Sequence, residues 1–267
     1  MPSSVSIDRE AGGIAVVTLA KEPVNTMDLS LWEELLAAIN TLEADSEVRA
    51  VVFRSGLKRS VFTAGLDIKE LYAPSTNKER LFKFWGVLSE VLTRVYTSRL
   101  VTAAAINGAC PAGGCGLSLC CDLRIITADG SMGLNEVQLG IPVPLFWVEL
   151  FASVSGQRQA ERYLQTGEMV PSAQLLKLSM VDAVVDKAEQ VLPATLDEVR
   201  KWLKFPDEGR IATKSVLRGP FGDRWKAGIP TEAAKVWESC SDPKTVAALG
   251  KVLERLSGGG GKKASKL

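Results

Sequence analysis

The stretch INGACPAGGCG, from Ile106 to Gly116, decides the fold of this 267-residue chain. It follows an apolar run, Val101 to Ile106, that is typical of a buried strand, and it leads into a short apolar helix. Backbone N–H groups at a helix start point outward and lie at the positive end of the helix dipole. We therefore interpret the stretch as a strand-to-helix turn able to stabilise negative charge.

The glycine-rich turn differs from two common nucleotide-binding patterns. It lacks the Gly-Lys-Ser/Thr ending of a phosphate-binding P-loop, and Gly108, Gly113 and Gly114 do not fit the G-x-G-x-x-G pattern of dinucleotide-binding proteins. Taken alone, the glycines are also compatible with close helix–strand packing and no chemistry.

Outward from this turn, the chain alternates between predicted strands and helices. Strands are expected at 14–19, 50–53 and 123–126. A capping box at Ser30 to Glu33 is expected to open one helix, and apolar residues from Leu81 to Val95 predict another. This rhythm indicates an α/β fold.

The second half of the chain is mainly helical in pattern. Helices are expected at 157–165, 188–203, 209–217 and 231–256, and a short strand at 183–185. We therefore predict an α/β catalytic core over 1–200, a helical C-terminal segment over 201–256 and a flexible tail over 257–267.

Composition excludes several classes of protein. The chain has no histidine, so Ser-His-Asp triads and histidine bases are excluded, and proton transfer falls to Asp, Glu, Lys, Tyr or Cys. Its net charge of +1 does not suggest a nucleic-acid partner. No run of about 18 apolar residues predicts a membrane span. The five cysteines have no zinc-site spacing, so no metal is expected and they are interpreted as buried apolar residues.

The last three residues, Ser265, Lys266 and Leu267, match a peroxisomal address that an import receptor reads. A glycine-rich spacer precedes them and would present them to that receptor. We therefore expect localisation to the peroxisomal matrix.

Two more segments have residue types suited to catalysis. In VFTAGLDI, residues 61–68, the small Ala64 and Gly65 precede a helix expected near Leu66. One N–H group from this segment and one from the glycine-rich turn would form an oxyanion hole. In the segment 133–142, Glu136 is a single carboxylate in apolar surroundings, either an exposed helix-start acid or a buried base. Beside two candidate oxyanion loops in a histidine-free chain, the catalytic interpretation is favoured.

Together these segments resemble the enoyl-CoA hydratase/isomerase (crotonase) superfamily, from about Val5 to Leu256. The stretches 106–115 and 134–141 are most similar to the mitochondrial type of 3,2-enoyl-CoA isomerase. The resemblance implies a spiral of strand–strand–helix repeats and a helical C-terminal segment that forms homotrimers, with a hexamer as the alternative. It also implies an acyl-CoA thioester substrate and no separate cofactor, because coenzyme A is part of the substrate.

The resemblance assigns roles to particular residues. The N–H groups of Leu66 and Gly113 would hold the thioester carbonyl, Glu136 would be the acid/base, and Asn135 would lie at the substrate. Coenzyme A would bind near Ala64, Gly65, Leu66, Asp67 and Ile68, with Lys58, Arg59 or Lys214 as candidates for its phosphates.

One departure from the family pattern bears on the reaction. Hydratases of this superfamily use two glutamates, and the position of the first is Gly116 in this chain. A double-bond shift needs one carboxylate, which removes a proton and returns it elsewhere on the substrate. We therefore expect 3-enoyl-CoA to trans-2-enoyl-CoA isomerisation, with Phe146 and Trp147 around Glu136 raising its pKa. Hydration, dienoyl-CoA isomerisation and a non-catalytic acyl-CoA-binding protein are the alternatives.

Overall fold

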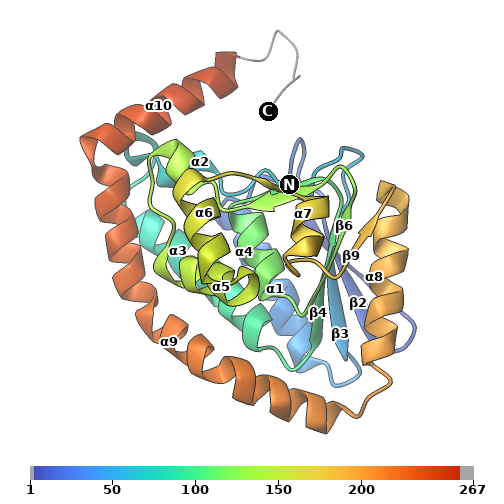
Figure 1. Cartoon of the computed structure of the whole chain (residues 1–267). Coiled ribbons are helices and arrows are strands. Elements are labelled where there is room, and N and C mark those ends of the chain that lie inside the picture. Colours follow the sequence, from blue (N-terminus) through green and yellow to red (C-terminus); the bar gives the residue numbers. More distant parts are fainter. Residues whose placement is uncertain (1–2, 259–267) are drawn as a thin grey trace.

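A six-stranded sheet forms the centre of the computed structural model, which describes residues 3–258 (Figure 1). Its order is β1-β2-β3-β4-β6-β9, in which β1 pairs antiparallel to β2 and every other pair is parallel. The strands are β1 Val5–Glu10, β2 Ile14–Leu19, β3 Ala50–Ser55, β4 Val101–Ile106, β6 Leu123–Thr127 and β9 Ala183–Val185. The α/β fold and the strands predicted from the sequence are therefore confirmed.

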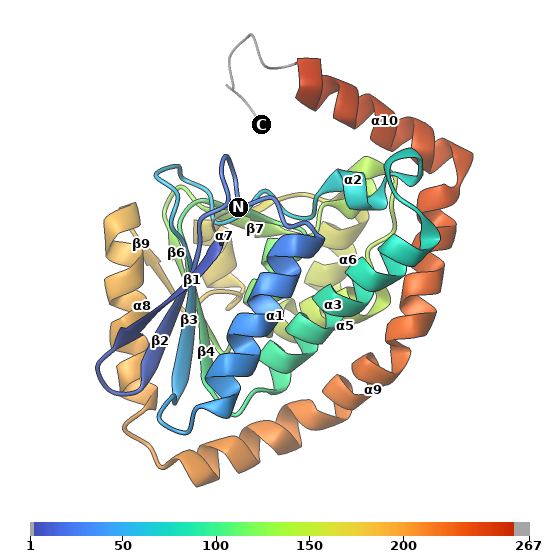
Figure 2. The same ribbon diagram turned by 180° about the vertical axis from the view of Figure 1, so that it is seen from behind.

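Side chains of the sheet alternate between two apolar cores, because successive residues of a strand point to opposite faces. Val51 and Phe53 of β3 belong to the core under α1 (Leu29–Ala44), α3 (Lys78–Thr97) and α4 (Gly113–Cys120), whereas Ala50 and Val52 belong to the core under α8 (Ala188–Trp202). Figure 2 shows α8 on one side of the sheet and α1 and α3 on the other.

A smaller sheet lies at one end of the main sheet and determines where the glycine-rich turn leads. Its order is β5-β7-β8, with β5 Ala109–Pro111 parallel to β7 Ser131–Gly133 and β8 Val170–Pro171 antiparallel to β7. Because Pro111 pairs with Gly133, the start of α4 and the residues after β7 are brought side by side.

The remaining helices connect and cover these sheets. They are α2 Ile68–Leu71, η1 Ala73–Ser75, η2 Glu136–Leu139, α5 Leu145–Ser155, α6 Gln157–Thr166, α7 Ser172–Lys177, α9 Asp207–Ser241 and α10 Pro243–Gly258. No helix among residues 3–258 is long and apolar enough to cross a lipid bilayer. All five cysteines are buried and have free thiols, in agreement with their interpretation as buried apolar residues.

Some predicted helix boundaries were wrong. Asp28 rather than Ser30 caps α1, since its Oδ1 accepts from the Leu31 N–H at 3.0 Å. The helix expected at 209–217 and the first part of the one expected at 231–256 are joined in one 35-residue helix, α9, which continues through Pro220 and Pro230, and the rest of the latter is α10. Packing along α3 outweighs the cost of these prolines.

The chain breaks instead between α9 and α10, at Asp242 and Pro243. The two helices form a curved arm around the core (Figures 1 and 2). Helix α10 continues to Gly258, so two residues predicted as tail are helical. The proposed peroxisomal address at 265–267 lies outside the described residues and stays a prediction.

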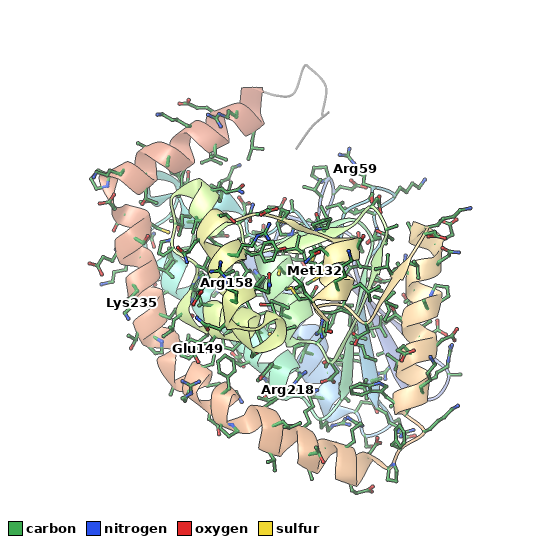
Figure 3. The ribbon with its side chains drawn as sticks, in the orientation of Figure 1. Arg59, Met132, Glu149, Arg158, Arg218 and Lys235 are labelled. Carbon is green, nitrogen blue, oxygen red and sulfur yellow. The ribbon has the colours of Figure 1, made fainter. Side chains whose placement is uncertain are left out.

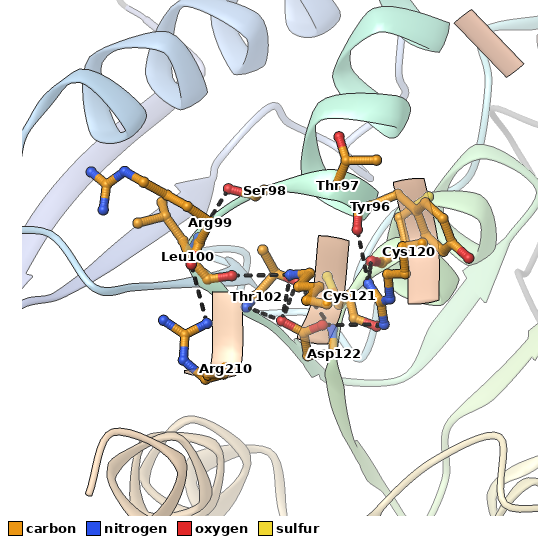
Figure 4. Close-up of polar contacts among 12 residues, drawn as sticks. Tyr96, Thr97, Ser98, Arg99, Leu100, Thr102, Cys120, Cys121, Asp122 and Arg210 are labelled. Carbon is orange, nitrogen blue, oxygen red and sulfur yellow. Dashed lines mark hydrogen bonds and ion pairs between the residues drawn. The ribbon is translucent and has the colours of Figure 1, made fainter. Parts of the chain in front are cut away.

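A buried charge cluster fastens α9 to the core (Figure 4). The Asp122 carboxylate accepts from Lys214 Nζ at 2.7 Å and from Arg218 at 3.1 Å, as well as from the Thr102 N–H at 2.9 Å. Lys214 also donates to the Leu100 carbonyl at 3.0 Å and is 8% exposed. The prediction that Lys214 could bind coenzyme A phosphates was therefore wrong, because its ammonium is buried against Asp122.

We predict that Asp122→Ala lowers the free energy of unfolding by about 3–5 kcal/mol, because it leaves two cations uncompensated where α9 meets the core. Asp197→Ala is the matched control, since Asp197 pairs with Arg200 in a contact whose side chains are 71% and 47% exposed. That control should cost less than about 1 kcal/mol. Urea denaturation of both variants measures the difference, and equal losses would contradict the prediction.

Candidate active site

The first candidate oxyanion loop, residues 61–68, is held by a strand-like bridge between Met27 and Leu66. The Met27 N–H donates to the Gly65 carbonyl at 2.9 Å, and the Asp67 N–H donates to the Met27 carbonyl at 3.1 Å. In such a parallel bridge the N–H of the central residue points away from its partner. The N–H of Leu66 is therefore directed away from Met27 and is free to bind another group.

The second candidate oxyanion loop is the start of α4. Ala112 caps this helix and has a φ of 47°, a left-handed conformation that is uncommon for a residue other than glycine. Its N–H donates to the Gly133 carbonyl at 2.8 Å, which anchors the turn to β7. The Gly116 N–H donates to the Ala112 carbonyl at 2.9 Å and begins the helical ladder, so the N–H of Gly113 precedes it.

The two loops touch backbone to backbone. A Cβ built on Gly65, whose φ is +87°, would lie 3.1 Å from the Ala112 Cβ and 3.2 Å from the Pro111 carbonyl oxygen. A Cβ on Gly113 would lie 2.6 Å from Leu66 Cδ2. The structure therefore brings Leu66 and Gly113 together, as the sequence interpretation requires.

Glu136 begins η2, three residues after β7, with Asn135 as the preceding, half-buried cap residue. Its side chain is 6% exposed, and neither carboxylate oxygen has a hydrogen-bond partner among residues 3–258. Burial raises the pKa of Glu136 to about 7. A carboxylate with such a pKa can both accept and donate a proton near neutral pH.

The two aromatic residues expected around Glu136 lie in different places. The Trp147 ring lies against Gly116 of α4, whereas Phe146 packs on α9, stacking on Trp225 at 5.8 Å and contacting Gly228. Burial is the main reason why the pKa of Cys115 is raised. The negative charge of the nearby Glu136 carboxylate also contributes to raising it. Met132 of β7 lies in the interior of the same region (Figure 3).

The other predicted binding residues have varied surroundings. Ala64 is exposed and Gly65 is buried, while Asp67 and Ile68 are half-buried. Asp67 also has a structural role, since it caps α2 by accepting from the Lys69 N–H at 2.9 Å. These residues lie beside Leu66 on one continuous loop.

Lys58 and Arg59 are exposed, and both line a cavity of about 660 Å³ between the end of β3 and α8. Figure 3 labels Arg59. Arg54, Asp129 and Asp186 line the cavity as well. Unlike Lys214, these two cations are accessible to a ligand.

Sequence reasoning missed Asn25, which shapes the first loop. Its side-chain Nδ2 donates to the Phe62 backbone carbonyl at 2.9 Å and to Ser55 Oγ at 3.0 Å. Its backbone carbonyl accepts from Thr63 Oγ1 at 2.6 Å. Asn25 is fully buried and has a φ of 51°. Its sequence neighbours, Val24, Thr26 and Met27, give no signal that could have identified it, because these three bonding partners lie at least 30 positions away.

An apolar cavity of about 470 Å³ lies between the η2–α5 connection and α9. Its lining includes Ile141, whose N–H donates to the Glu136 carbonyl at 3.2 Å, and Val236 of α9. A residue that lines the cavity is therefore hydrogen-bonded to the backbone of the candidate base. Among residues 3–258 there is no group of three or more Cys, Asp or Glu placed to hold a metal ion.

Comparisons with known proteins agree with this geometry. The family model described as enoyl-CoA hydratase/isomerase matches residues 9–244. Enoyl-CoA delta isomerase 1, mitochondrial, of Homo sapiens is 38% identical over 223 residues, covering 82% of this chain and 72% of the relative. A putative enoyl-CoA hydratase of Thermus thermophilus is 34% identical over 215 residues, covering 79% and 83%.

Solved structures extend the likeness to three dimensions. The crystal structure of human mitochondrial delta3-delta2-enoyl-CoA isomerase superimposes with a TM-score of 0.91 at 35% identity, covering 97% of this chain and all of the other. The enoyl-CoA hydratase of Bacillus halodurans shares the fold, with a TM-score of 0.85 at 22% identity over 93% of this chain and all of the other. With the family model matching residues 9–244 and a relative 38% identical over 82% of the chain, this chain belongs to the enoyl-CoA hydratase/isomerase family.

Proposed function

We propose that this protein is a delta3-delta2-enoyl-CoA isomerase, which converts 3-enoyl-CoA to trans-2-enoyl-CoA in fatty acid β-oxidation. The observation that carries the proposal is the buried Glu136 with a pKa of about 7, beside a helix that has Gly116 where a hydratase has a second glutamate. The relatives named as isomerases support it at 38% identity over about four fifths of this chain.

In the proposed mechanism, the Glu136 carboxylate removes a proton from the α-carbon of the acyl chain. The electron pair of that C–H bond spreads over a dienolate, whose negative charge resides mainly on the thioester oxygen. The N–H groups of Leu66 and Gly113 stabilise this charge, and one such donor is worth roughly 10² to 10³ in rate. Protonated Glu136 then returns the proton to the γ-carbon, so that the double bond moves by one position and Glu136 is regenerated.

Substrate binding follows from the same loops. Coenzyme A would lie along Ala64, Gly65, Leu66, Asp67 and Ile68, with Asn135 at the acyl group and exposed Lys58 and Arg59 available to its phosphates. The apolar cavity that starts at Ile141 offers room for the acyl chain.

Two other functions remain as alternatives. Hydration is favoured by the relatives named as hydratases, but it requires acid and base groups that a single carboxylate supplies poorly. A non-catalytic acyl-CoA-binding protein would keep the two loops and not depend on Glu136. The activity of the wild type and of the Glu136→Gln variant separates this alternative from an isomerase.

We also propose that the protein assembles as a homotrimer through its helical C-terminal segment. Phe205, Val216 and Leu217 are 66%, 78% and 74% exposed on the start of this segment, and apolar side chains exposed to that degree in a group are typical of an interface. Analytical ultracentrifugation should give the mass of three chains, and Leu217→Asp should shift it toward one chain. A monomer at all concentrations would contradict this proposal.

We predict that Glu136→Gln lowers kcat/KM for a 3-enoyl-CoA by roughly 10² to 10⁴, because glutamine cannot accept the α-proton. Binding of a saturated acyl-CoA, measured by calorimetry, should persist. Glu168→Gln is the control, since the Glu168 backbone lies near Gly133 of β7 while its side chain is 52% exposed and pairs with Arg162 at 4.0 Å. Full activity in Glu136→Gln would show that Glu136 is not the base, whereas a wild type that binds acyl-CoA without isomerising it would point to the binding-protein alternative.

The same variant should be more stable than the wild type at pH 8. A carboxyl group whose pKa is raised on folding stabilises the protein fully below its unfolded pKa, and this stabilisation is lost as the pH rises through about 7. The shift from 4.5 corresponds to about 3 kcal/mol at most. Loss of activity with a higher urea midpoint excludes unfolding as its cause.

The pH profile of the wild type should also report Glu136. Because its carboxylate form is the base, kcat/KM should rise with pH and level off above about pH 7. A profile that levels off near pH 4.5 would show that the acting carboxylate is not buried.

A further inference from the structure

The Trp147 indole lies flat against Gly116, the position at which a second carboxylate would stand. A Cβ built on Gly116 would lie 3.5 Å from Trp147 Cε2, 3.6 Å from Cζ2 and 3.7 Å from Cδ2. These distances are ordinary van der Waals contacts, so an alanine fits. A side chain longer than alanine would have to displace the ring.

The indole is held in place by groups that belong to other helices. Glu232 of α9 accepts from the Phe146 N–H at 3.2 Å, which fixes the first turn of α5 just before Trp147. It also accepts from Trp85 Nε1 at 3.0 Å. Trp85 in turn stacks on Trp147, with ring centroids 6.0 Å apart and an interplanar angle of 23°. The Trp147 ring therefore cannot swing away from Gly116 without breaking this arrangement.

Bulk, rather than a hydrogen bond, is what Trp147 contributes at this place. Its side chain is fully buried, and its Nε1 has no acceptor among residues 3–258. A buried donor without a partner is costly, and an apolar side chain would avoid the cost. What the indole supplies beyond a smaller residue is filled volume next to α4.

We propose that Trp147 is a specificity-determining residue, which together with Gly116 fills the space that hydration would require. This inference rests on the proposed isomerase function. Hydration breaks an O–H bond of water and the π bond between the α- and β-carbons, and it forms a C–O bond at the β-carbon and a C–H bond at the α-carbon. That reaction needs room for the water and a second group to handle its protons. With the indole in that space, the proton on Glu136 goes back to the acyl chain, and the product is the shifted double bond.

The test is a double-mutant cycle of wild type, Gly116→Glu, Trp147→Leu and the combination of both. Each protein is assayed with a 3-enoyl-CoA for isomerisation and with trans-2-enoyl-CoA for hydration, and the ratio of the two rates is compared. Trp225→Leu is the matched control, because Trp225 is also fully buried with an unpartnered Nε1 but packs on Phe146 rather than on Gly116. Circular dichroism checks that each variant is folded, and Trp147→Phe replaces Trp147→Leu if the latter does not fold.

We expect Gly116→Glu alone to gain little hydration, because its carboxylate cannot occupy the space held by the indole. The combined variant should hydrate roughly 10² times faster than Gly116→Glu, the contribution of a placed acid/base group. Trp225→Leu should keep the wild-type ratio of hydration to isomerisation.

Two results would overturn the inference. One is hydration by Gly116→Glu as fast as by the combined variant, and the other is a folded combined variant with the ratio of the wild type. Failure of the proposed function is a different observation, namely a wild type that does not isomerise 3-enoyl-CoA, and it would remove the basis of the inference as well.

Discussion

The close approach of two backbone segments, at Gly65 and at Pro111–Ala112, is the constraint on which the site depends. With 3.1–3.2 Å available for a Cβ at Gly65, and a positive φ there, only glycine fits without strain. This contact sets the N–H groups of Leu66 and Gly113 near each other. Asn25 and the β5–β7 pairing hold the two segments from outside. Glu136 is placed by the same pairing, since it lies three residues after the end of β7.

Helix α4 links this contact to the rest of the core. Its C-terminal carbonyls are occupied by arginines: Arg218 donates to the Cys120 carbonyl at 2.9 Å, and Arg124 donates to the Cys121 carbonyl at 2.7 Å. Cations at this end complement the negative pole of the helix, while the positive pole at Gly113 faces the site. The buried cluster at Asp122 therefore serves stability and also fixes the helix that supplies the proposed oxyanion donor, the Gly113 N–H.

Local sequence patterns predicted the elements that are locally determined. The strands at 14–19 and 101–106 have apolar runs, and α6 ends next to Gly167, which has the left-handed conformation of a C-cap as expected. Predictions failed where distant contacts decide. Nothing near Pro220 and Pro230 indicates that α3 will support a continuous helix. Nothing near Lys214 indicates that Asp122 lies opposite it, and Phe146 packs on α9 because of Gly228, 82 positions away in the sequence.

The cluster at Asp122 joins residues that are synthesised at different times. Asp122 and its partner Lys214 are 92 residues apart. At a synthesis rate of roughly 5–20 residues per second, Lys214 is made roughly 5–20 s after Asp122. During translation the sheet and α4 are thus complete before α9 exists, and Asp122 must remain hydrated until the C-terminal arm arrives. The final closure of this core is therefore a late event, in which helix α9 replaces water around a charge that was made long before.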